Sequence, residues 1–354
     1  MTKSDRSFKR LMERLIVSEY FILILSALYF VVIGIFRPAM FRFNTITNII
    51  SNMWPLLAVC LGQTFVLLLG GIDLSQTAVI SFCSMVTGVL LGSKFEAIKF
   101  GKSPLFGSLL KESGGVLSDL PDVAGTMLTV LIVLAIGAFI GWINGMFVAK
   151  LDMPPFMITL ISEMIWSGLA LWFVYSQNCT GINASFNKLG TGKIGPIPIP
   201  FLVLLLLLLV CEFILSRTIF GRWIYSVGAN GRASVISGIP RSRVIIFVYS
   251  VSGFCAAVGS IIYTARQQMG RPTLGEGMLN DVLGATVIGG TSMYGGKGRA
   301  IWSFYGVIFY CIMTTSLNML HLNSFIVQAI KGCVILFAVS LDIVRTTIQK
   351  RMTV

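Results

Sequence analysis

The sequence predicts an all-α polytopic membrane protein with about ten transmembrane helices, some of them broken or re-entrant. The chain of 354 residues is 55% hydrophobic and only 12% charged, whereas soluble domains carry about 25% charged residues. Its apolar residues gather in runs close to the ~20 residues that a helix needs to cross a bilayer. No soluble domain of useful size remains between these runs, so the whole fold is expected to lie in or against lipid.

Nine apolar runs have the length and composition of membrane spans. A tenth run, residues 281–293, is short and rich in glycine. We expect it to be a broken helix or a re-entrant segment, because irregular backbone is tolerated at membrane depth only where protein or water covers it. The nine clear runs are residues 19–36, 46–69, 76–92, 124–149, 156–175, 198–215, 244–265, 300–320 and 324–342.

The distribution of basic residues predicts the orientation of the chain. With ten crossings and both termini in the cytoplasm, the inner segments hold more Lys and Arg than the outer ones, as the positive-inside rule requires. The net charge of +13 is explained in this way, without nucleic-acid binding. The predicted organisation is a cytoplasmic segment 1–18, a membrane domain 19–342 with a long external loop 93–123 and a cytoplasmic loop 216–243, and a cytoplasmic tail 343–354. Nine crossings would instead place the basic C-terminus outside.

Residues 216–243, here called the basic loop, contain five arginines and no acid. The loop is too polar to cross a bilayer. Trp223, Ile224, Val235 and Ile236 are expected to anchor it through apolar contacts, so that it is compact rather than a disordered tether. A compact basic loop on the cytoplasmic side indicates a surface that meets another protein.

Charged side chains inside the apolar runs are costly and therefore informative. Asp73 follows the second run, and two interpretations stay open: it caps the helix 76–92 together with Ser75, or it contacts a substrate. Glu163 lies deep in the fifth run, where a functional role and a structural pairing are equally supported. Lys331 is expected to pair with an internal acid or to snorkel. The side chains expected to form interhelical hydrogen bonds are Asn144, Asn318 and Gln328.

Glycine spacing makes two further predictions. Gly137, Gly141 and Gly145 recur every fourth residue, which favours close packing of one helix face against another. The densest glycine run, residues 284–298, suits a broken helix beside a gate. Its glycines do not have the spacing of a phosphate-binding loop, so ATP binding through such a loop is excluded. The seven cysteines show no paired spacing, and we expect no disulfide framework and no metal site.

Several sequence blocks together resemble the membrane-spanning permease subunits of ribose/galactose-type ABC importers. The resemblance runs from about residue 46 to residue 342, and the order and spacing of the blocks make it specific. The matching blocks are Gly70-Gly71-Ile72-Asp73-Leu74-Ser75; Asn144-Gly145 with Pro155-Phe156, Thr159-Leu160 and Gly168-Leu169-Ala170; the segment from Gly221 to Ile239; Pro272-Thr273 with Gly275, Asp281, Gly289-Gly290-Thr291-Ser292 and Gly295-Gly296; and Lys331-Gly332 with Asp342.

The resemblance implies a transport subunit of the bacterial inner membrane, not an enzyme. Two permease copies, identical or related, would form the path for a monosaccharide or related polyol. Separate cytoplasmic ATPase subunits would bind the ATP, and a periplasmic or lipid-anchored binding protein would deliver the sugar. The segment that would dock on the ATPase comprises Gly221, Arg222, Tyr225, Gly228, Asn230, Arg232, Ala233, Ser237, Gly238 and Ile239. The path or gate would comprise Asp73, Ser75, Glu163, Asp281, Gly289, Gly290, Thr291 and Ser292.

The chain departs from the pattern of these permeases near the expected path. Glu163 and Ser167 replace residues that are commonly apolar and Arg, and the loop 93–123 is longer than usual. The resemblance therefore implies a sugar-type substrate without identifying the sugar. The alternative function is a secondary transporter or channel that works alone and uses Asp73 and Glu163 as ion or proton sites.

Overall fold

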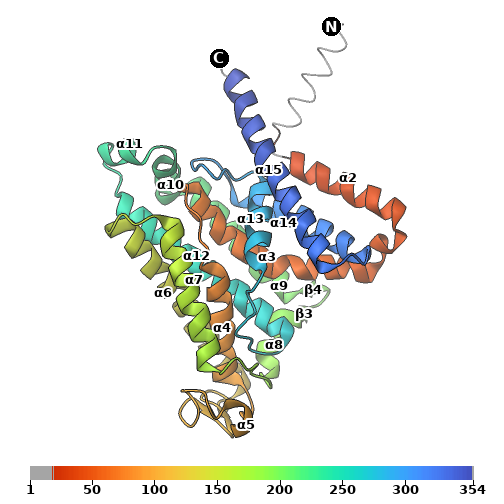
Figure 1. The fold of residues 1–354 in the computed structure, drawn as a ribbon, viewed down its shortest axis with the longest axis vertical. Coiled ribbons are helices and arrows are strands. Elements are labelled where there is room, and N and C mark those ends of the chain that lie inside the picture. Colours follow the sequence, from red (N-terminus) through yellow and green to blue (C-terminus); the bar gives the residue numbers. More distant parts are fainter. Residues whose placement is uncertain (1–17, 19, 353–354) are drawn as a thin grey trace.

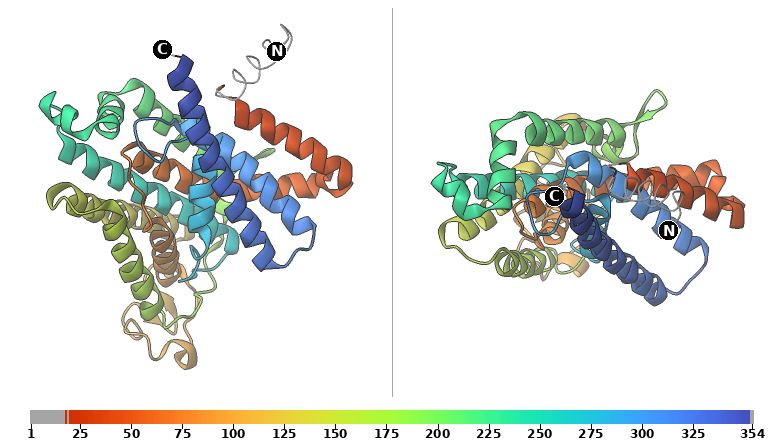
Figure 2. Two further views of the ribbon diagram at one scale, coloured as in Figure 1. Left: turned by 45° about the horizontal axis from the view of Figure 1, so that its top comes forward. Right: turned by 90° about the horizontal axis from the view of Figure 1, so that it is seen from above.

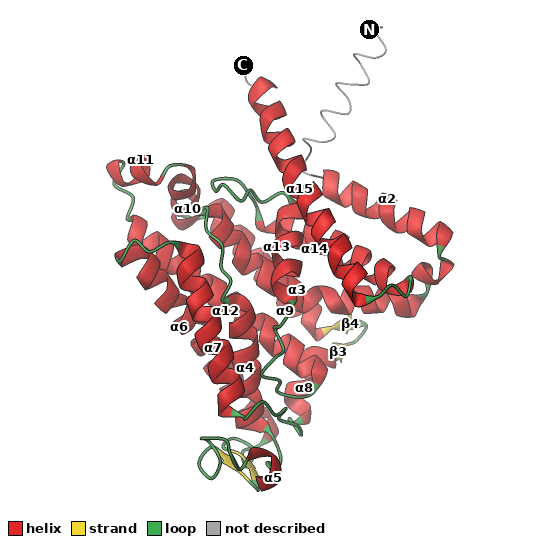
Figure 3. Cartoon of the chain, viewed as in Figure 1, coloured by secondary structure: helices red, strands yellow, loops and turns green. Residues whose placement is uncertain are grey.

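The computed structural model describes residue 18 and residues 20–352, and their regular structure is almost entirely helical (Figures 1 and 3). Of the predicted N-terminal segment 1–18, only Ser18 belongs to the described part. Six described helices are long and apolar enough to cross a membrane. They are α3 (Phe43–Leu68), α6 (Asp122–Lys150), α7 (Pro155–Phe173), α9 (Ile199–Arg217), α12 (Arg241–Gln267) and α14 (Ala300–Met319).

Four further apolar helices are shorter or only partly apolar: α2 (Phe21–Phe36), α4 (Gln76–Leu91), α13 (Met278–Gly289) and α15 (Ser324–Met352). All ten fall on the predicted runs, which confirms the all-α class, whereas ten crossings stay a prediction. α13 ends at Gly289 rather than at residue 293. α15 continues beyond the predicted end of its span, into the predicted tail.

The remaining elements are short and lie in the connections. Each pair of strands forms a two-stranded antiparallel ribbon. The short elements are η1 (Pro38–Phe41), α5 (Ala97–Phe100), β1 (Leu110–Lys111), β2 (Gly114–Gly115), α8 (Ala184–Thr191), β3 (Lys193–Ile194), β4 (Ile197–Pro198), α10 (Ile219–Ala229) and α11 (Gly231–Ile236).

α12 occupies the centre of the bundle and packs on α3, α4, α6 and α8. Its contact with α6 uses the predicted glycine face. A Cβ atom at Gly141 would overlap the carbonyl oxygen of Tyr249, and one at Gly137 would lie 2.5 Å from the carbonyl oxygen of Gly253. The two backbones touch directly, which confirms the packing predicted from the spacing of these glycines.

The two ends of the molecule differ in structure. α10, α11 and the C-terminal end of α15 lie at one end, and α5 with residues 93–123 lies at the opposite end (Figure 1). Residues 93–123 fold compactly: Phe95 and Phe100 are buried with their rings edge to face at 5.1 Å, and the Ser103 hydroxyl donates to the Phe173 carbonyl at the end of α7. α2 and α15 lie at the periphery in the view from above (Figure 2).

Candidate translocation path and docking surface

Asp73 is the centre of a buried polar network between three parts of the bundle. It lies in the turn between α3 and α4 and is 1% exposed. Its Oδ1 accepts hydrogen bonds from the backbone N–H of Ser75 at 3.0 Å and from the Ser75 hydroxyl at 2.6 Å. Its Oδ2 accepts from Ser252 of α12 at 2.6 Å. Asn144 of α6 donates to the Ser75 hydroxyl at 2.9 Å, which confirms its predicted interhelical bond.

The predicted capping of α4 by Asp73 and Ser75 is wrong. Ser75 occupies the N-cap position, but no side chain accepts a hydrogen bond from the first turn of α4. The reason is that Asp73 bonds to the backbone N–H two residues ahead, in a local turn that competes with a cap. The Ser75 hydroxyl is then committed to Asp73 and Asn144. The network therefore holds the α3–α4 turn against α6 and α12.

Asp281 faces a different environment, at the N-terminal end of α13. Lys331 of α15 donates to its two carboxylate oxygens at 2.9 and 3.2 Å, which confirms the predicted pairing of this lysine with an internal acid. The Tyr310 hydroxyl also donates to Asp281. The side chains of Lys331 and Asp281 are 18% and 27% exposed, so water reaches the pair.

Two adjoining cavities open onto this pair. They are together called the outer cavity because they lie at the Asp281 end of α13, away from the end that leads to residues 290–299. One has a volume of about 630 Å³ and the other about 190 Å³, and Asp281 and Asn318 line both. The larger volume falls within the roughly 300–1,000 Å³ that small-molecule sites occupy. Polar side chains from α3, α12, α13, α14 and α15 contribute to the walls: Asn52, Arg266, Asn280, Asp281, Thr314, Thr315, Asn318, Gln328 and Lys331.

These walls offer both donors and acceptors of hydrogen bonds. Arg266 is oriented by its bonds to the Ser51 carbonyl at 2.7 Å and to Asn52 Oδ1 at 2.8 Å. The Thr314 hydroxyl is buried and finds no hydrogen-bond partner among the described residues. Asn318 and Gln328, expected to bond between helices, line the cavity instead.

The basic loop folds into the two helices α10 and α11, which the sequence analysis did not predict. The Thr218 hydroxyl caps α10 by accepting from the Gly221 N–H at 3.2 Å. Asn230 ends α10 and caps α11 by accepting from the Ala233 N–H at 3.0 Å. Each cap satisfies a backbone donor that the start of a helix leaves open.

The prediction of four apolar anchors in this loop is confirmed for two of them. Ile224 is fully buried and Trp223 is half-buried against the core. Val235 and Ile236, in contrast, are exposed, Ile236 to 88%. The prediction failed for them because α11 has only six residues and turns these side chains away from the bundle. Arg222 and Arg232 are exposed as well, so the tip of the loop combines positive charge with apolar surface.

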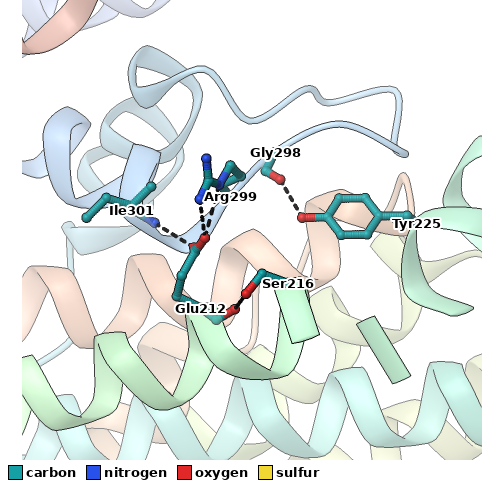
Figure 4. A network of polar contacts seen from close by, with 6 residues as sticks. All are labelled: Glu212, Ser216, Tyr225, Gly298, Arg299 and Ile301. Carbon is teal, nitrogen blue, oxygen red and sulfur yellow. Dashed lines mark hydrogen bonds and ion pairs between the residues drawn. The ribbon is translucent and has the colours of Figure 1, made fainter. Parts of the chain in front are cut away.

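The glycine-rich loop, residues 290–299, lies directly against α10 (Figure 4). The Tyr225 hydroxyl donates to the Gly298 carbonyl at 2.7 Å. The Gly296 N–H donates to the Leu68 carbonyl at the end of α3, at 2.9 Å. A side chain at Gly228 would overlap that same carbonyl oxygen. The ends of α3 and α10 and the glycine-rich loop thus meet backbone to backbone.

Figure 4 also shows an ion pair that the sequence analysis missed, between Glu212 of α9 and Arg299. Glu212 Oε1 accepts from Arg299 at 3.0 and 2.7 Å, and Oε2 accepts from the Ile301 N–H at 3.3 Å. Glu212 therefore binds the residue before α14 and the first turn of that helix. The available signal was an acid inside the predicted span 198–215.

The predicted path residues thus fall into separate places. Asp73 and Ser75 belong to the buried network, and Asp281 lies in the outer cavity. Gly289 is the last residue of α13, and Gly290, Thr291 and Ser292 follow it, with Gly290 in a left-handed backbone conformation at φ 108°. Glu163 is half-buried on α7, and Ser167 of the same helix donates to it at 3.4 Å.

Comparison with known proteins decides the family. Residues 45–339 match the family described as the permease component of branched-chain amino acid transport systems. The chain belongs to this permease family. The permease is 32% identical over 315 residues to the ribose import permease protein of Bacillus subtilis strain 168, covering 88% of each chain. No solved structure matches the permease.

Other relatives support the same assignment. The permease is 30% identical over 346 residues to the ribose import permease protein of Haemophilus influenzae, covering 97% of the permease and 98% of the relative. It is 28% identical over 325 residues to a D-allose transport system permease protein of Escherichia coli K12, covering 92% and 91%. The resemblance inferred from the sequence blocks is confirmed, and the family is one of transport components rather than enzymes.

Proposed function

We propose that the permease forms the path of an ABC importer for a monosaccharide or related polyol in the bacterial inner membrane. Its chain crosses the membrane ten times with both termini in the cytoplasm, and two permease copies act together. Cytoplasmic ATPase subunits drive transport, and an external binding protein delivers the sugar. The named substrates of its relatives, ribose and D-allose, support a sugar-type solute.

The polar lining of the outer cavity is the observation on which the proposed substrate class rests. A monosaccharide presents many hydroxyls, each of which needs both a donor and an acceptor when it leaves water. The cavity supplies amide, hydroxyl and paired charged groups, and Lys331 balances the charge of Asp281. A branched-chain amino acid, the solute in the family's description, would need an apolar pocket for its side chain. The walls also carry Leu322, Val327 and Ile335, so it is the number of amide, hydroxyl and charged groups beside them that favours a sugar.

The tip of the basic loop is the proposed docking surface for the ATPase. Interfaces between proteins favour a dry apolar centre together with arginine. Ile236 and Val235 provide exposed apolar groups, and Arg222 and Arg232 provide the charge. The loop lies at the end of the molecule opposite residues 93–123, which are expected to face the binding protein (Figure 1).

Co-purification and uptake test this function. The permease, its ATPase and its binding protein are reconstituted in liposomes, and ATP-dependent uptake of ribose, allose, galactose and leucine is compared. We expect uptake of a sugar, and I236E should weaken retention of the ATPase at least about ten-fold, as for a hot-spot residue. The matched control is I98E, at the opposite end of the molecule, where Ile98 is 98% exposed.

The alternative, a stand-alone transporter using Asp73 and Glu163, predicts uptake by the permease alone under an ion gradient. Such uptake without the ATPase would refute the importer function. Uptake of leucine but no sugar would refute the substrate class while leaving the importer intact.

A further inference from the structure

α10 packs closely against the glycine-rich loop and is hydrogen-bonded to it. The Tyr225 hydroxyl donates to the Gly298 carbonyl, and a Cβ atom at Gly228 would lie 2.8 Å from the backbone nitrogen of Gly296. Burial and the nearby Glu212 carboxylate raise the pKa of Tyr225 to about 12, so its hydroxyl stays a donor at physiological pH. Movement of α10 is therefore transmitted to the loop.

The loop in turn connects two helices that pack as one body. A Cβ atom at Gly306 of α14 would overlap the Ala285 carbonyl of α13, and one at Gly289 would overlap the Trp302 carbonyl. Backbones in direct contact cannot shift past each other without a clash, because packed interiors deform little. α13, the glycine-rich loop and α14 thus form a rigid hairpin.

This hairpin ends at the outer cavity. α13 carries Asp281 at the end opposite the glycine-rich loop, paired with Lys331 of α15. α14 contributes Thr314 and Asn318 to the same walls. At its inner end the hairpin is held by Glu212 of α9, which binds Arg299 and the Ile301 N–H. A rotation about this inner attachment displaces the cavity residues at the outer end.

We propose that the hairpin of residues 278–319 carries movements of the docking surface to the outer cavity, and that Tyr225 is the positioning residue that engages it. The inference rests on the proposed function, since it takes ATPase docking at the basic loop as its input. Displacement of α10 by the ATPase rotates the hairpin, and Asp281, Thr314 and Asn318 then move relative to Lys331 on α15. The cavity loses its fit to the solute, which is released.

The substitution Y225F removes only the hydroxyl that donates to the Gly298 carbonyl. The complete complex is reconstituted in liposomes, and sugar uptake per ATP hydrolysed is measured alongside ATPase retention. One lost hydrogen bond of ordinary strength corresponds to about a five-fold change, so uptake per ATP should fall by about that factor. Retention should stay at the wild-type level, because Tyr225, although expected from the sequence to belong to the docking segment, is half-buried and its hydroxyl bonds to Gly298 rather than lying on the exposed tip of the loop. Y29F is the matched control, because it also removes one tyrosine hydrogen bond to the hairpin, the bond between Tyr29 of α2 and Ser316, but at the end of α14 opposite Gly298 and away from α10.

The outcomes separate the inference from the function on which it rests. Wild-type uptake per ATP in Y225F would overturn the inference, and so would an equal loss in Y29F. Loss of ATPase retention in Y225F would make Tyr225 a docking residue and would also overturn it. A wild-type complex that retains no ATPase would refute the proposed function itself, before Y225F is considered.

A distance measurement tests the movement directly. Spin labels are placed at I219C on α10, Y294C on the glycine-rich loop and L151C after α6, three exposed positions outside the docking surface, with C333S as background because the other six cysteines are buried. On ATP binding to the assembled complex, the distance between labels 219 and 294 should stay constant while that between labels 151 and 294 changes. A changing 219–294 distance with a constant 151–294 distance would overturn the proposal.

Discussion

The buried network around Asp73 predicts a large difference between two similar substitutions. In D73A, Ser75 loses two hydrogen bonds and Ser252 loses one. At about 1 kcal/mol for each bond, D73A should lower the free energy of unfolding by about 3 kcal/mol. In D73N, the amide oxygen retains both bonds to Ser75. Its NH₂ group replaces the acceptor beside Ser252, so the cost should be about 1 kcal/mol.

Titration of the purified permease in mixed micelles with a denaturing detergent measures both values. Equal stability of D73A and D73N would refute the reasoning, because it would mean that the two hydrogen bonds to Ser75, which only D73N retains, contribute nothing. Sugar uptake by D73N provides a second check. If D73N folds like the wild type yet transports nothing, Asp73 contacts the solute, and the structural account of the network is wrong.

Two other predictions concern helix packing and the charged pair. G141A places a methyl group against the Tyr249 carbonyl and should cost about 1–3 kcal/mol in the same titration; G168A, where nothing lies within 4 Å, should cost nothing, and equal losses would contradict the packing argument. K331M leaves Asp281 unpaired and should cost about 2 kcal/mol, less than a fully buried pair because water reaches the site. The double variant D281N/K331M should regain most of that stability; a double variant as unstable as K331M would contradict the pairing.

The helices were largely predictable because the length of an apolar run is a local property of the sequence. The short apolar run 281–293 corresponds to the short helix α13. The spacing of Gly137, Gly141 and Gly145 correctly predicted a close helix–helix contact. The pairing of Lys331 was also predictable, since a charge deep in an apolar run needs a partner. The sequence did not show that this partner is Asp281, 50 residues away.

Other parts depended on contacts between distant segments and were missed. Arg299 and Glu212 lie 87 residues apart. An acid inside the predicted span 198–215 indicates a need for a partner, but nothing in the sequence points to Arg299. The orientation of Val235 and Ile236 depends on how α11 sits on the bundle, which apolar character alone does not indicate. The capping prediction for Asp73 and Ser75 failed for two reasons. One is local, the turn in which Asp73 accepts from the Ser75 N–H, and the other is distant, because Ser252 bonds to Asp73 and Asn144 to Ser75 from other helices.

The shortness of α13 has a consequence for the energy of transport. Its 12 residues span about 18 Å at 1.5 Å per residue, whereas the hydrocarbon layer is about 30 Å thick. The outer cavity lies at one end of this helix and the glycine-rich loop at the other. On the proposed path, a sugar that follows α13 would travel only this short distance between the two, well below the thickness of the membrane. Dehydration, which is costly for a molecule with many hydroxyls, would then be confined to a short section of the path.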